Sequence, residues 1–262
     1  MNFREIAPSP LLEKLIQSYW VADGSSLSAE EKYVILPDGC FDLVIDIYSR
    51  KGNAIVLTGI WDKRIEVTIG KGQITVGCRF YPAAIDVFFR CRVADFNNSS
   101  VTFDEAMLQT DSGIDLTQLW TIKDAEDLLS YLDCCFTMMK ISATGEGALL
   151  LSMQEKDPEQ SIGDFARTTG LSSRQLHRHC QNRFGISPKT YCNIQRFICA
   201  KGLLAHDKDL DLADIALQCH YYDQAHFIKE FKRFSGITPA AYRQKRRMSD
   251  SYNTTGCQDG KV

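Results

Sequence analysis

The feature that most constrains this chain is an internal repeat in its last hundred residues. The segment Arg183–Tyr191 has the sequence RFGISPKTY, and it recurs about 50 residues later as RFSGITPAAY over Arg233–Tyr242, with one inserted residue. Two copies are too few for a solenoid, which needs at least about three repeats. The repeat therefore predicts a small helical unit that occurs twice.

The first copy has the sequence of two helices joined by a short turn. The first helix would cover IGDFARTT, and Gly170 can end it because glycine accepts a positive φ at no steric cost. Leu171 would fill the corner, and Ser172 or Ser173 would cap a second helix, RQLHRHCQNRF. The small Ala166, four residues before the glycine, would let the two helices cross closely. The pattern predicts a helix-turn-helix unit.

The second copy repeats this pattern with two differences. It has the sequence DLADIALQCH followed by YYDQAHFIKEFKRF, and Ala216 takes the place of the small residue. His220 stands where the turn glycine is expected, and one extra residue lies in the turn before Asp223, which can cap the second helix. A residue other than glycine at positive φ costs roughly 1 kcal/mol. We therefore expect the second unit to be looser, or its turn to differ in shape.

A single long helix is expected between the two copies. The segment PKTYCNIQRFICAKGLLAH starts with proline, which is favoured at the first position of a helix, and it continues as a helix for about five turns. Such a helix would fix the spacing of the two units. Units about 34 Å apart can enter successive major grooves on one face of a DNA duplex.

Charge and side-chain chemistry point to DNA as the partner. Residues 158–247 have a net charge of +7, whereas residues 1–157 have a net charge of −9. This asymmetry is typical of a polyanion-binding domain joined to a domain of another kind. A solvated surface is the alternative for any single Arg or Lys. The side chains that suit base edges and phosphates are Arg174, Gln175, His177, Arg178, Gln181 and Arg183 in the first unit, and Gln224, His226, Lys229, Lys232 and Arg233 in the second.

The first hundred residues predict a mostly-β domain. Short apolar and β-branched runs at 33–49, 53–61, 64–69 and 73–81 are separated by turn signals, which favours a barrel or a sandwich. Helical spacing follows over 102–140. An apolar stripe on the last of these helices either packs against its own domain or forms a dimer helix. The stripe consists of Leu128, Leu129, Leu132, Phe136 and Met139.

These patterns together predict an α+β protein of two domains. The first domain would cover residues 1–145, with β-structure to about residue 100, and a hinge is expected near Ser142–Gly147. A linker would follow at 146–157, then an all-helical double helix-turn-helix domain at 158–247 and a flexible tail at 248–262.

Residues 158–247 resemble the DNA-binding domain of AraC/XylS-type transcription regulators. The matching segments are SIGDFARTTGLSSRQLHRHCQNRFGISPKTY, RFICAKGLL and YYDQAHFIKEFKRFSGITPAAYR. The resemblance implies seven helices, with base reading by Arg174 and Arg178 beside His177. In the second recognition helix it implies a reading face of Gln224, Ala225, His226 and Lys229. Two positions depart from the family pattern: His220 replaces the usual glycine, and Ala225 replaces a small hydroxyl residue.

The N-terminal part resembles a sensor-type domain found ahead of this DNA-binding module. The segments SPLLEKLIQSYW, ILPDGCFDLVIDI, LTGIW and VGCRFYPAA carry the resemblance, which implies effector binding or dimerisation. The Pro37–Cys40 turn is either a special site or a plain hairpin turn. Four aromatic residues either line a pocket or fill the core; they are Trp20, Trp61, Phe80 and Tyr81.

The sequence thus predicts a sequence-specific transcription regulator, responsive to an effector and located in the cytoplasm. Its expected partners are double-stranded DNA, RNA polymerase if it activates, a small-molecule effector and a second copy of the chain, with no membrane. Two alternatives stay open, a DNA-binding enzyme with a reactive N-terminal cysteine and an N-terminal domain that only binds other proteins. No common catalytic motif occurs, so we expect no enzyme and no cofactor.

The cysteines allow two interpretations. The chain has ten of them, and none shows the paired spacing of a zinc site, so no metal is expected. Reduced thiols in the core or on the surface are the simpler interpretation. A redox switch is the alternative.

Overall fold

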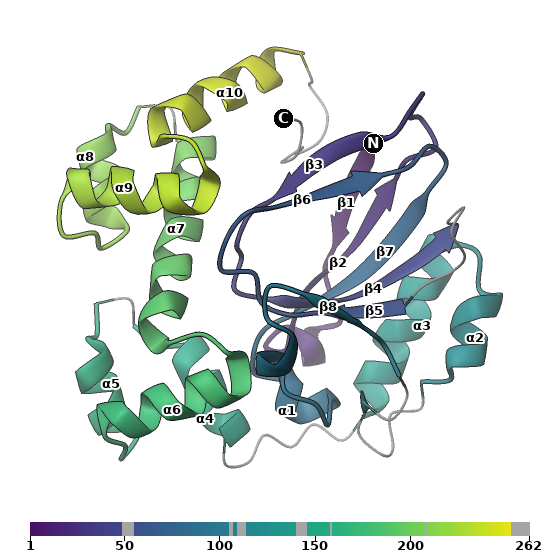
Figure 1. Cartoon of the computed structure of the whole chain (residues 1–262), viewed down its shortest axis with the longest axis horizontal. Coiled ribbons are helices and arrows are strands. Elements are labelled where there is room, and N and C mark those ends of the chain that lie inside the picture. The colour runs from purple at the N-terminus through teal and green to yellow at the C-terminus, as the bar shows by residue number, and fades with distance from the viewer. Residues whose placement is uncertain are drawn as a thin grey trace.

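The computed structural model describes residues 1–48, 55–104, 107–108, 114–139, 146–157, 159–207 and 209–252 (Figure 1). A mostly-β N-terminal domain precedes an all-helical C-terminal domain, which confirms the predicted fold class. No helix in these ranges is long and apolar enough to cross a membrane. Most of the hinge expected at Ser142–Gly147 lies outside the described residues. So does most of the tail expected at 248–262, but residues 248–252 are helical.

The N-terminal domain is built on an open, antiparallel sheet of six strands in the order β1-β2-β7-β4-β5-β8. Strands β3 and β6 form a separate two-stranded sheet, and the larger sheet does not close into a barrel. The alternating pattern of the sequence identified most of these strands. Their bounds are β1 (Asn2–Ile6), β2 (Ile16–Asp23), β3 (Glu31–Ile35), β4 (Phe41–Tyr48), β5 (Ile55–Thr58), β6 (Ile65–Ile69), β7 (Ile74–Phe80) and β8 (Ser100–Thr102).

Short helices interrupt and follow the strands of this domain. The structure places a helix, α1, directly after β7, where the sequence predicted only strands. The bounds are η1 (Pro10–Leu12), α1 (Ala84–Phe88), η2 (Val93–Phe96), α2 (Leu116–Thr121), α3 (Ala125–Met138) and α4 (Glu146–Gln154). Helix α4 occupies most of the segment expected as a linker, so the described part of that connection is largely helical.

The apolar stripe of α3 packs against its own domain. All five of its side chains are buried. The Phe136 ring lies 5.2 Å from Phe80 and 4.8 Å from Phe88, between ring centroids, so α3 completes an aromatic core over β7 and α1. The interpretation of this stripe as the surface of a dimer helix is therefore wrong. Phe80 fills the core, and Trp20 covers the backbone of β7 at Gly77.

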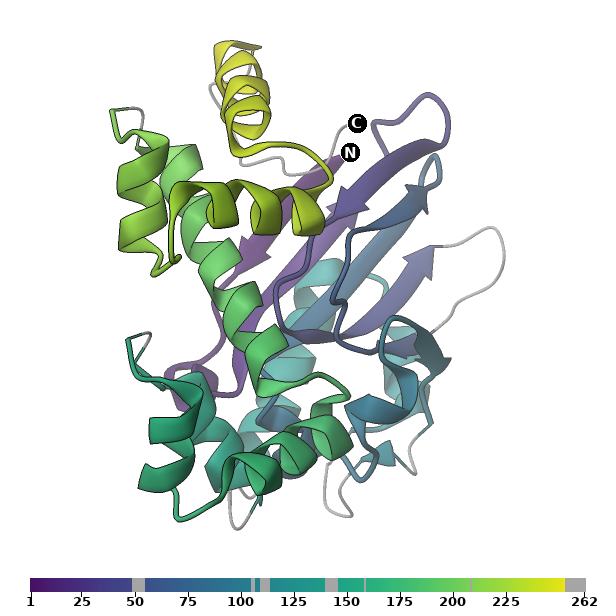
Figure 2. The ribbon, with the colours of Figure 1, turned by 60° about the vertical axis from the view of Figure 1, so that its left-hand side comes forward.

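The C-terminal domain consists of two helix-turn-helix units joined by the long helix α7. Figures 1 and 2 show α5 and α6 at one end of α7, and α8 and α9 at the other. The apolar face of α7 is buried at Ile194, Phe197, Ala200 and Leu204. The bounds are α5 (Ile162–Thr168), α6 (Ser173–Phe184), α7 (Pro188–His206), α8 (Leu212–Gln218), α9 (Gln224–Ser235) and α10 (Pro239–Tyr252).

The N-terminal domain contacts the first unit at the end of α6. Arg183 forms an ion pair with Asp86 of α1, and both side chains are mostly buried. The Asn97 side-chain amide donates a hydrogen bond to the Phe184 carbonyl. Gly185 has φ +68°, and a side chain there would collide with Asn97. The first recognition helix therefore ends directly on the N-terminal domain.

The Pro37–Cys40 turn forms a second contact between the domains. Gly39 has φ +73°, and its Cα faces Tyr191, Ile194 and Gln195 of α7. The Asp38 carboxylate, like that of Asp42, lies 3.1 Å from Nε of the largely buried Arg79. The turn is therefore held by charge pairs on one side and packs against the linker helix on the other. It is not a hairpin turn, because it joins β3 and β4, which lie in different sheets.

The close approach of Trp20 to Gly77 gives a stability prediction. A Cβ at residue 77 would lie 2.1 Å from the indole, and this strand pairs on both sides, so neither group can withdraw. We expect Gly77→Ala to lower the free energy of unfolding by about 1–3 kcal/mol, as measured by urea denaturation.

Gly202→Ala is the matched control for this variant. A Cβ at Gly202 in α7 meets no atom within 4 Å, so this change should leave stability unchanged or raise it by about 0.5–1 kcal/mol. Equal stability of Gly77→Ala and the wild type would show that the indole is not fixed over the strand.

Candidate DNA-binding surface

The first unit has the predicted cap and turn chemistry. Ser161 caps α5 by accepting a hydrogen bond from the Asp164 amide. Ser172, rather than Ser173, caps α6 by accepting a hydrogen bond from the Gln175 amide. The Gln175 side chain in turn accepts one from the Ser172 amide, which completes a capping box. Gly170 has φ +72° in the turn between the two helices. These local contacts fix where the recognition helix α6 begins.

The second unit reaches the same turn geometry with histidine in place of glycine. His220 has φ 57° and is one of two described non-glycine residues at positive φ. Its amide donates to the Leu217 carbonyl, and the Tyr221 amide donates to Ala216; Gly170 and Leu171 make the corresponding bonds in the first unit. The difference lies in the extra residue that follows, Tyr222, whose side chain is 92% exposed. The turn is longer, but its hydrogen bonding is the same.

The cap of α9 is also as predicted. Asp223 accepts a hydrogen bond of 2.7 Å from the His226 amide. Behind the turn, Tyr221 packs on Phe227 with ring centroids 5.1 Å apart, and Phe227 and Phe231 are fully buried. Aromatic packing thus replaces the smaller leucine packing of the first unit and holds the second recognition helix in place.

The predicted DNA-contacting residues lie on the outer faces of α6 and α9. In α6 the exposed side chains surround a shallow hollow that also includes Ser172, Gln175 and Asn182. Among the predicted residues of α9, His226 alone is partly buried, and the others are exposed. The exposed or half-exposed residues are Arg174, His177, Arg178 and Gln181 in α6, and Gln224, Ala225, His226, Lys229, Lys232 and Arg233 in α9.

Some of the predicted donors already have partners in the protein. Arg183 faces the N-terminal domain, so it is not part of the exposed surface. Gln181 donates to the Gly185 carbonyl at 2.8 Å, and Arg233 lies 3.0 Å from the Glu230 carboxylate and over the Phe234 ring. Arg174, Arg178, Lys229 and Lys232 therefore remain the stronger candidates for contacts to DNA.

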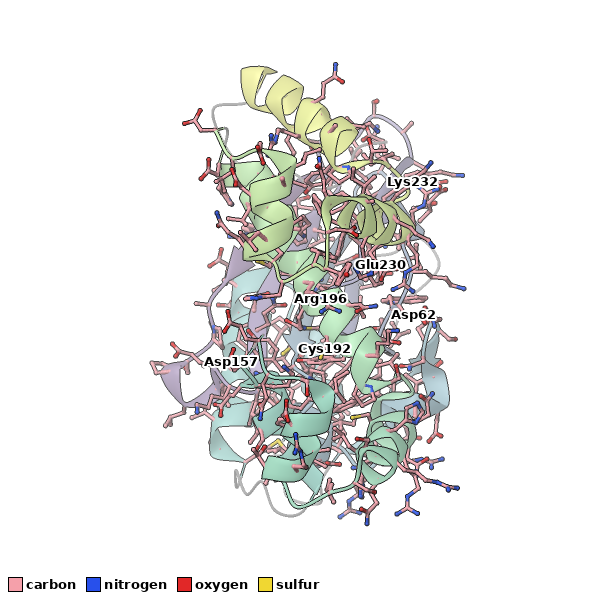
Figure 3. The ribbon with its side chains drawn as sticks, turned by 90° about the vertical axis from the view of Figure 1, so that its left-hand side faces the viewer. Asp62, Asp157, Cys192, Arg196, Glu230 and Lys232 are labelled. Atoms are coloured by element: carbon pink, nitrogen blue, oxygen red, sulfur yellow. The ribbon has the colours of Figure 1, made fainter. Side chains whose placement is uncertain are left out.

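Arg196 of α7 is a further cation between the two units, and the sequence did not single it out. Figure 3 shows it in the middle of the face that carries both units, with Glu230 beside it and Lys232 at the edge of α9. Its guanidinium bonds to Asn193, which in turn bonds to Glu230 at 2.9 Å, and it lies 5.8 Å from the centre of the Tyr221 ring. In the sequence, the only signal for Arg196 is its position on the face of the linker helix opposite the buried apolar residues.

The turn of the second unit gives a stability prediction. Replacing His220 by glycine removes the cost of a side chain at positive φ, so His220→Gly should raise the free energy of unfolding by up to about 1 kcal/mol. Gly170→Ala should lower it by a similar amount at the matched position. Thermal unfolding of both variants checks this, and a less stable His220→Gly protein would mean that the imidazole stabilises the turn.

Comparison with known sequences separates the same two parts of the chain. Residues 165–245 match the family described as "Helix-turn-helix domain", and residues 4–102 match one described as "Domain of unknown function (DUF6597)". The transcriptional activator RhaS of Enterobacter sp. (strain 638) is 39% identical over 91 residues, which is 35% of this chain and 32% of RhaS. The uncharacterised regulator YtdP of Bacillus subtilis (strain 168) is 33% identical over 93 residues, 36% of this chain and 12% of YtdP.

The chain therefore spans about a third or less of the length of these relatives. Among solved structures, an AraC-type transcriptional regulator from Chromobacterium violaceum is 28% identical, with a TM-score of 0.34, and the match covers 37% of this chain and 88% of that one. The matched residues of this chain are those of the two helix-turn-helix units and the linker helix between them. The C-terminal part of the chain is thus a helix-turn-helix domain of the AraC/XylS type, and a separate N-terminal domain precedes it.

Proposed function

We propose that this protein is a sequence-specific DNA-binding transcription regulator. The observation that carries the proposal is the pair of exposed, donor-rich recognition helices at the two ends of α7. With 19 residues, α7 is about 28 Å long at 1.5 Å per residue, close to the roughly 34 Å between successive major grooves. Helices α6 and α9 would each enter one groove, and Arg196 would face the phosphates between them.

The relatives support this function. RhaS proteins from several enterobacteria are named as transcriptional activators, and their similarity to this chain lies in the helix-turn-helix domain. If this protein also activates, RNA polymerase is its further partner. The operator is read by base contacts of α6 and α9, while lysine and arginine contacts to phosphate supply affinity that falls with salt.

The N-terminal domain would make DNA binding responsive to an effector or a protein partner. Three of its contacts with the C-terminal domain support this role, because they involve the ends of the recognition helices α6 and α9 and the first half of α7. Any ligand that changes the packing of η2 or of the Pro37–Cys40 turn would alter the position of the first unit. Such a ligand shifts the equilibrium only by its differential affinity for the two arrangements.

Three of the five N-terminal cysteines do not favour the enzyme alternative. Burial raises the pKa of Cys40 and of Cys78 well above the usual range, and it raises the pKa of Cys91 to about 11. A nucleophilic cysteine needs an accessible thiolate at neutral pH. These three thiols lack that property.

Arg178 tests the proposed recognition surface. If its guanidinium makes a bidentate contact to a base, Arg178→Ala should weaken binding to a selected operator by about 1–3 kcal/mol, or roughly 5- to 150-fold, with little loss on random DNA. Gel shifts on both DNAs across a salt series measure this difference.

Lys71→Ala is the matched control, because Lys71 is an exposed cation of the N-terminal domain. It should leave both affinities unchanged. An equal loss on operator and random DNA would reduce Arg178 to a phosphate contact. Unchanged binding would remove α6 from the interface.

Asp86 tests the coupling between the domains. Asp86→Asn removes the charge that faces the mostly buried Arg183, so the end of α6 should detach more readily from the N-terminal domain. We expect faster hydrogen exchange at residues 93–97 and 181–186, with β4 and β7 still protected. Asp127→Asn is the control, because Asp127 is an exposed carboxylate of α3 and lies outside both of these segments. Identical exchange in the two variants would show that the ion pair does not hold the interface.

A further inference from the structure

Two cysteines of the C-terminal domain lie side by side behind the turn of the second unit. Cys199 is on α7, and Cys219 is the residue at which α8 ends. Their Sγ atoms are 2.8 Å apart, and both thiols are free. Cys219 is 1% exposed, whereas Cys199 is open to solvent. An oxidant in solution can therefore reach the Cys199 sulfur, and the buried Cys219 sulfur lies next to it.

The pair also differs chemically from the other cysteines near it. The Cys219 thiol donates a hydrogen bond to Cys199, which lowers the pKa of Cys199 to about 7. Burial raises the pKa of Cys180 to about 12 and also raises that of Cys192. The lowered pKa of Cys199 favours its thiolate, the form that reacts with oxidants. Among the described residues no cluster of His, Cys, Asp or Glu is arranged to hold a metal ion, so no metal site competes for these sulfurs.

We propose that Cys199 and Cys219 are an oxidation site that forms a disulfide in response to hydroperoxides. The Cys199 thiolate attacks one oxygen of hydrogen peroxide, the O–O bond breaks, and the departing hydroxide takes a proton to become water. Cys199 is then a sulfenic acid. Cys219 loses its proton and attacks the Cys199 sulfur, the S–O bond breaks, and a second water leaves. Two thiols are oxidised to one disulfide, and one peroxide is reduced to two waters.

The disulfide would connect the linker helix to the turn before the second recognition helix. A disulfide bond is about 2.05 Å long, so the two sulfurs need to approach by about 0.8 Å. Cys219 directly precedes His220, whose carbonyl and neighbouring Tyr221 ring already contact Arg196 of α7. The bond would restrict the turn at its strained residue. On the proposed function, it would limit how α9 adjusts to a DNA groove.

Peptide mapping of the full-length protein tests the site without reference to DNA. Trypsin cleavage after Arg196 and Lys201 releases FICAK with Cys199, and cleavage after Lys208 and Lys229 releases Asp209–Lys229 with Cys219; each peptide has a single cysteine. After brief treatment with hydrogen peroxide, mass spectrometry should find the two peptides joined, at the sum of their masses less two hydrogens. Dithiothreitol should separate them.

Cys199→Ser and Cys134→Ser form the matched pair of variants, because both replace an exposed cysteine. The joined peptide should vanish in the first and persist in the second. The proposal would be overturned if Cys199 and Cys219 stayed reduced while other cysteines were oxidised. It would also be overturned if either residue formed a disulfide mainly with a different cysteine.

A gel shift on oxidised protein tests the consequence for DNA binding. We expect the wild type to bind its operator at least threefold more weakly after oxidation and Cys199→Ser to bind unchanged. If the two peptides are joined but the affinity of the oxidised protein for its operator is unchanged, the oxidation site is supported and its effect on DNA binding is overturned. Failure of reduced protein to bind any DNA would instead count against the proposed function.

Discussion

The burial of one face of α7 is the interaction on which the rest of this structure depends. Ile194, Phe197, Ala200 and Leu204 are almost completely buried, and Phe197 packs on Phe231 and Phe234 of the second unit, with ring centroids 5.0 and 5.2 Å apart. Fully burying a Leu, Ile or Phe side chain stabilises a protein by about 1.5–3 kcal/mol. The same helix meets the Gly39 turn of the N-terminal domain. Both units and the other domain are thus positioned relative to one helix.

Local sequence signals predicted most of the C-terminal domain. The caps at Ser161, Ser172 and Asp223 depend on contacts within three residues, so they could be identified without knowing the fold. The repeat supplied the duplication, and the proline at position 188 supplied the start of α7. The turn at His220 keeps the backbone hydrogen bonds of the turn in the first unit, and it differs from that turn in length, by the one residue Tyr222.

The N-terminal domain was less predictable, because its arrangement depends on contacts between residues far apart in the chain. Strands β3 to β7 followed from apolar and β-branched runs between turn signals, but β1, β2 and β8, the order of the strands in the sheet and its open edge did not. The α3 stripe allowed two interpretations, and only its packing against Phe80 and Phe88 decided between them. The DNA-binding surface was unpredictable for the same reason. In the sequence, Arg183 could not be distinguished from the exposed residues of α6, because its partner, Asp86, is 97 positions away.

The glycines that end the two recognition helices have a shared consequence. Gly185 lies against Asn97 and Gly236 against the Arg64 guanidinium, so α6 and α9 both terminate on the N-terminal domain. Neither unit can swing about its end of α7 without breaking one of these contacts. The distance between half-sites that the protein accepts is therefore a property of the whole chain. On the proposed function, a C-terminal domain alone would tolerate more variation in operator spacing, and selectivity among genomic sites would depend on contacts that the N-terminal domain makes with α6 and α9.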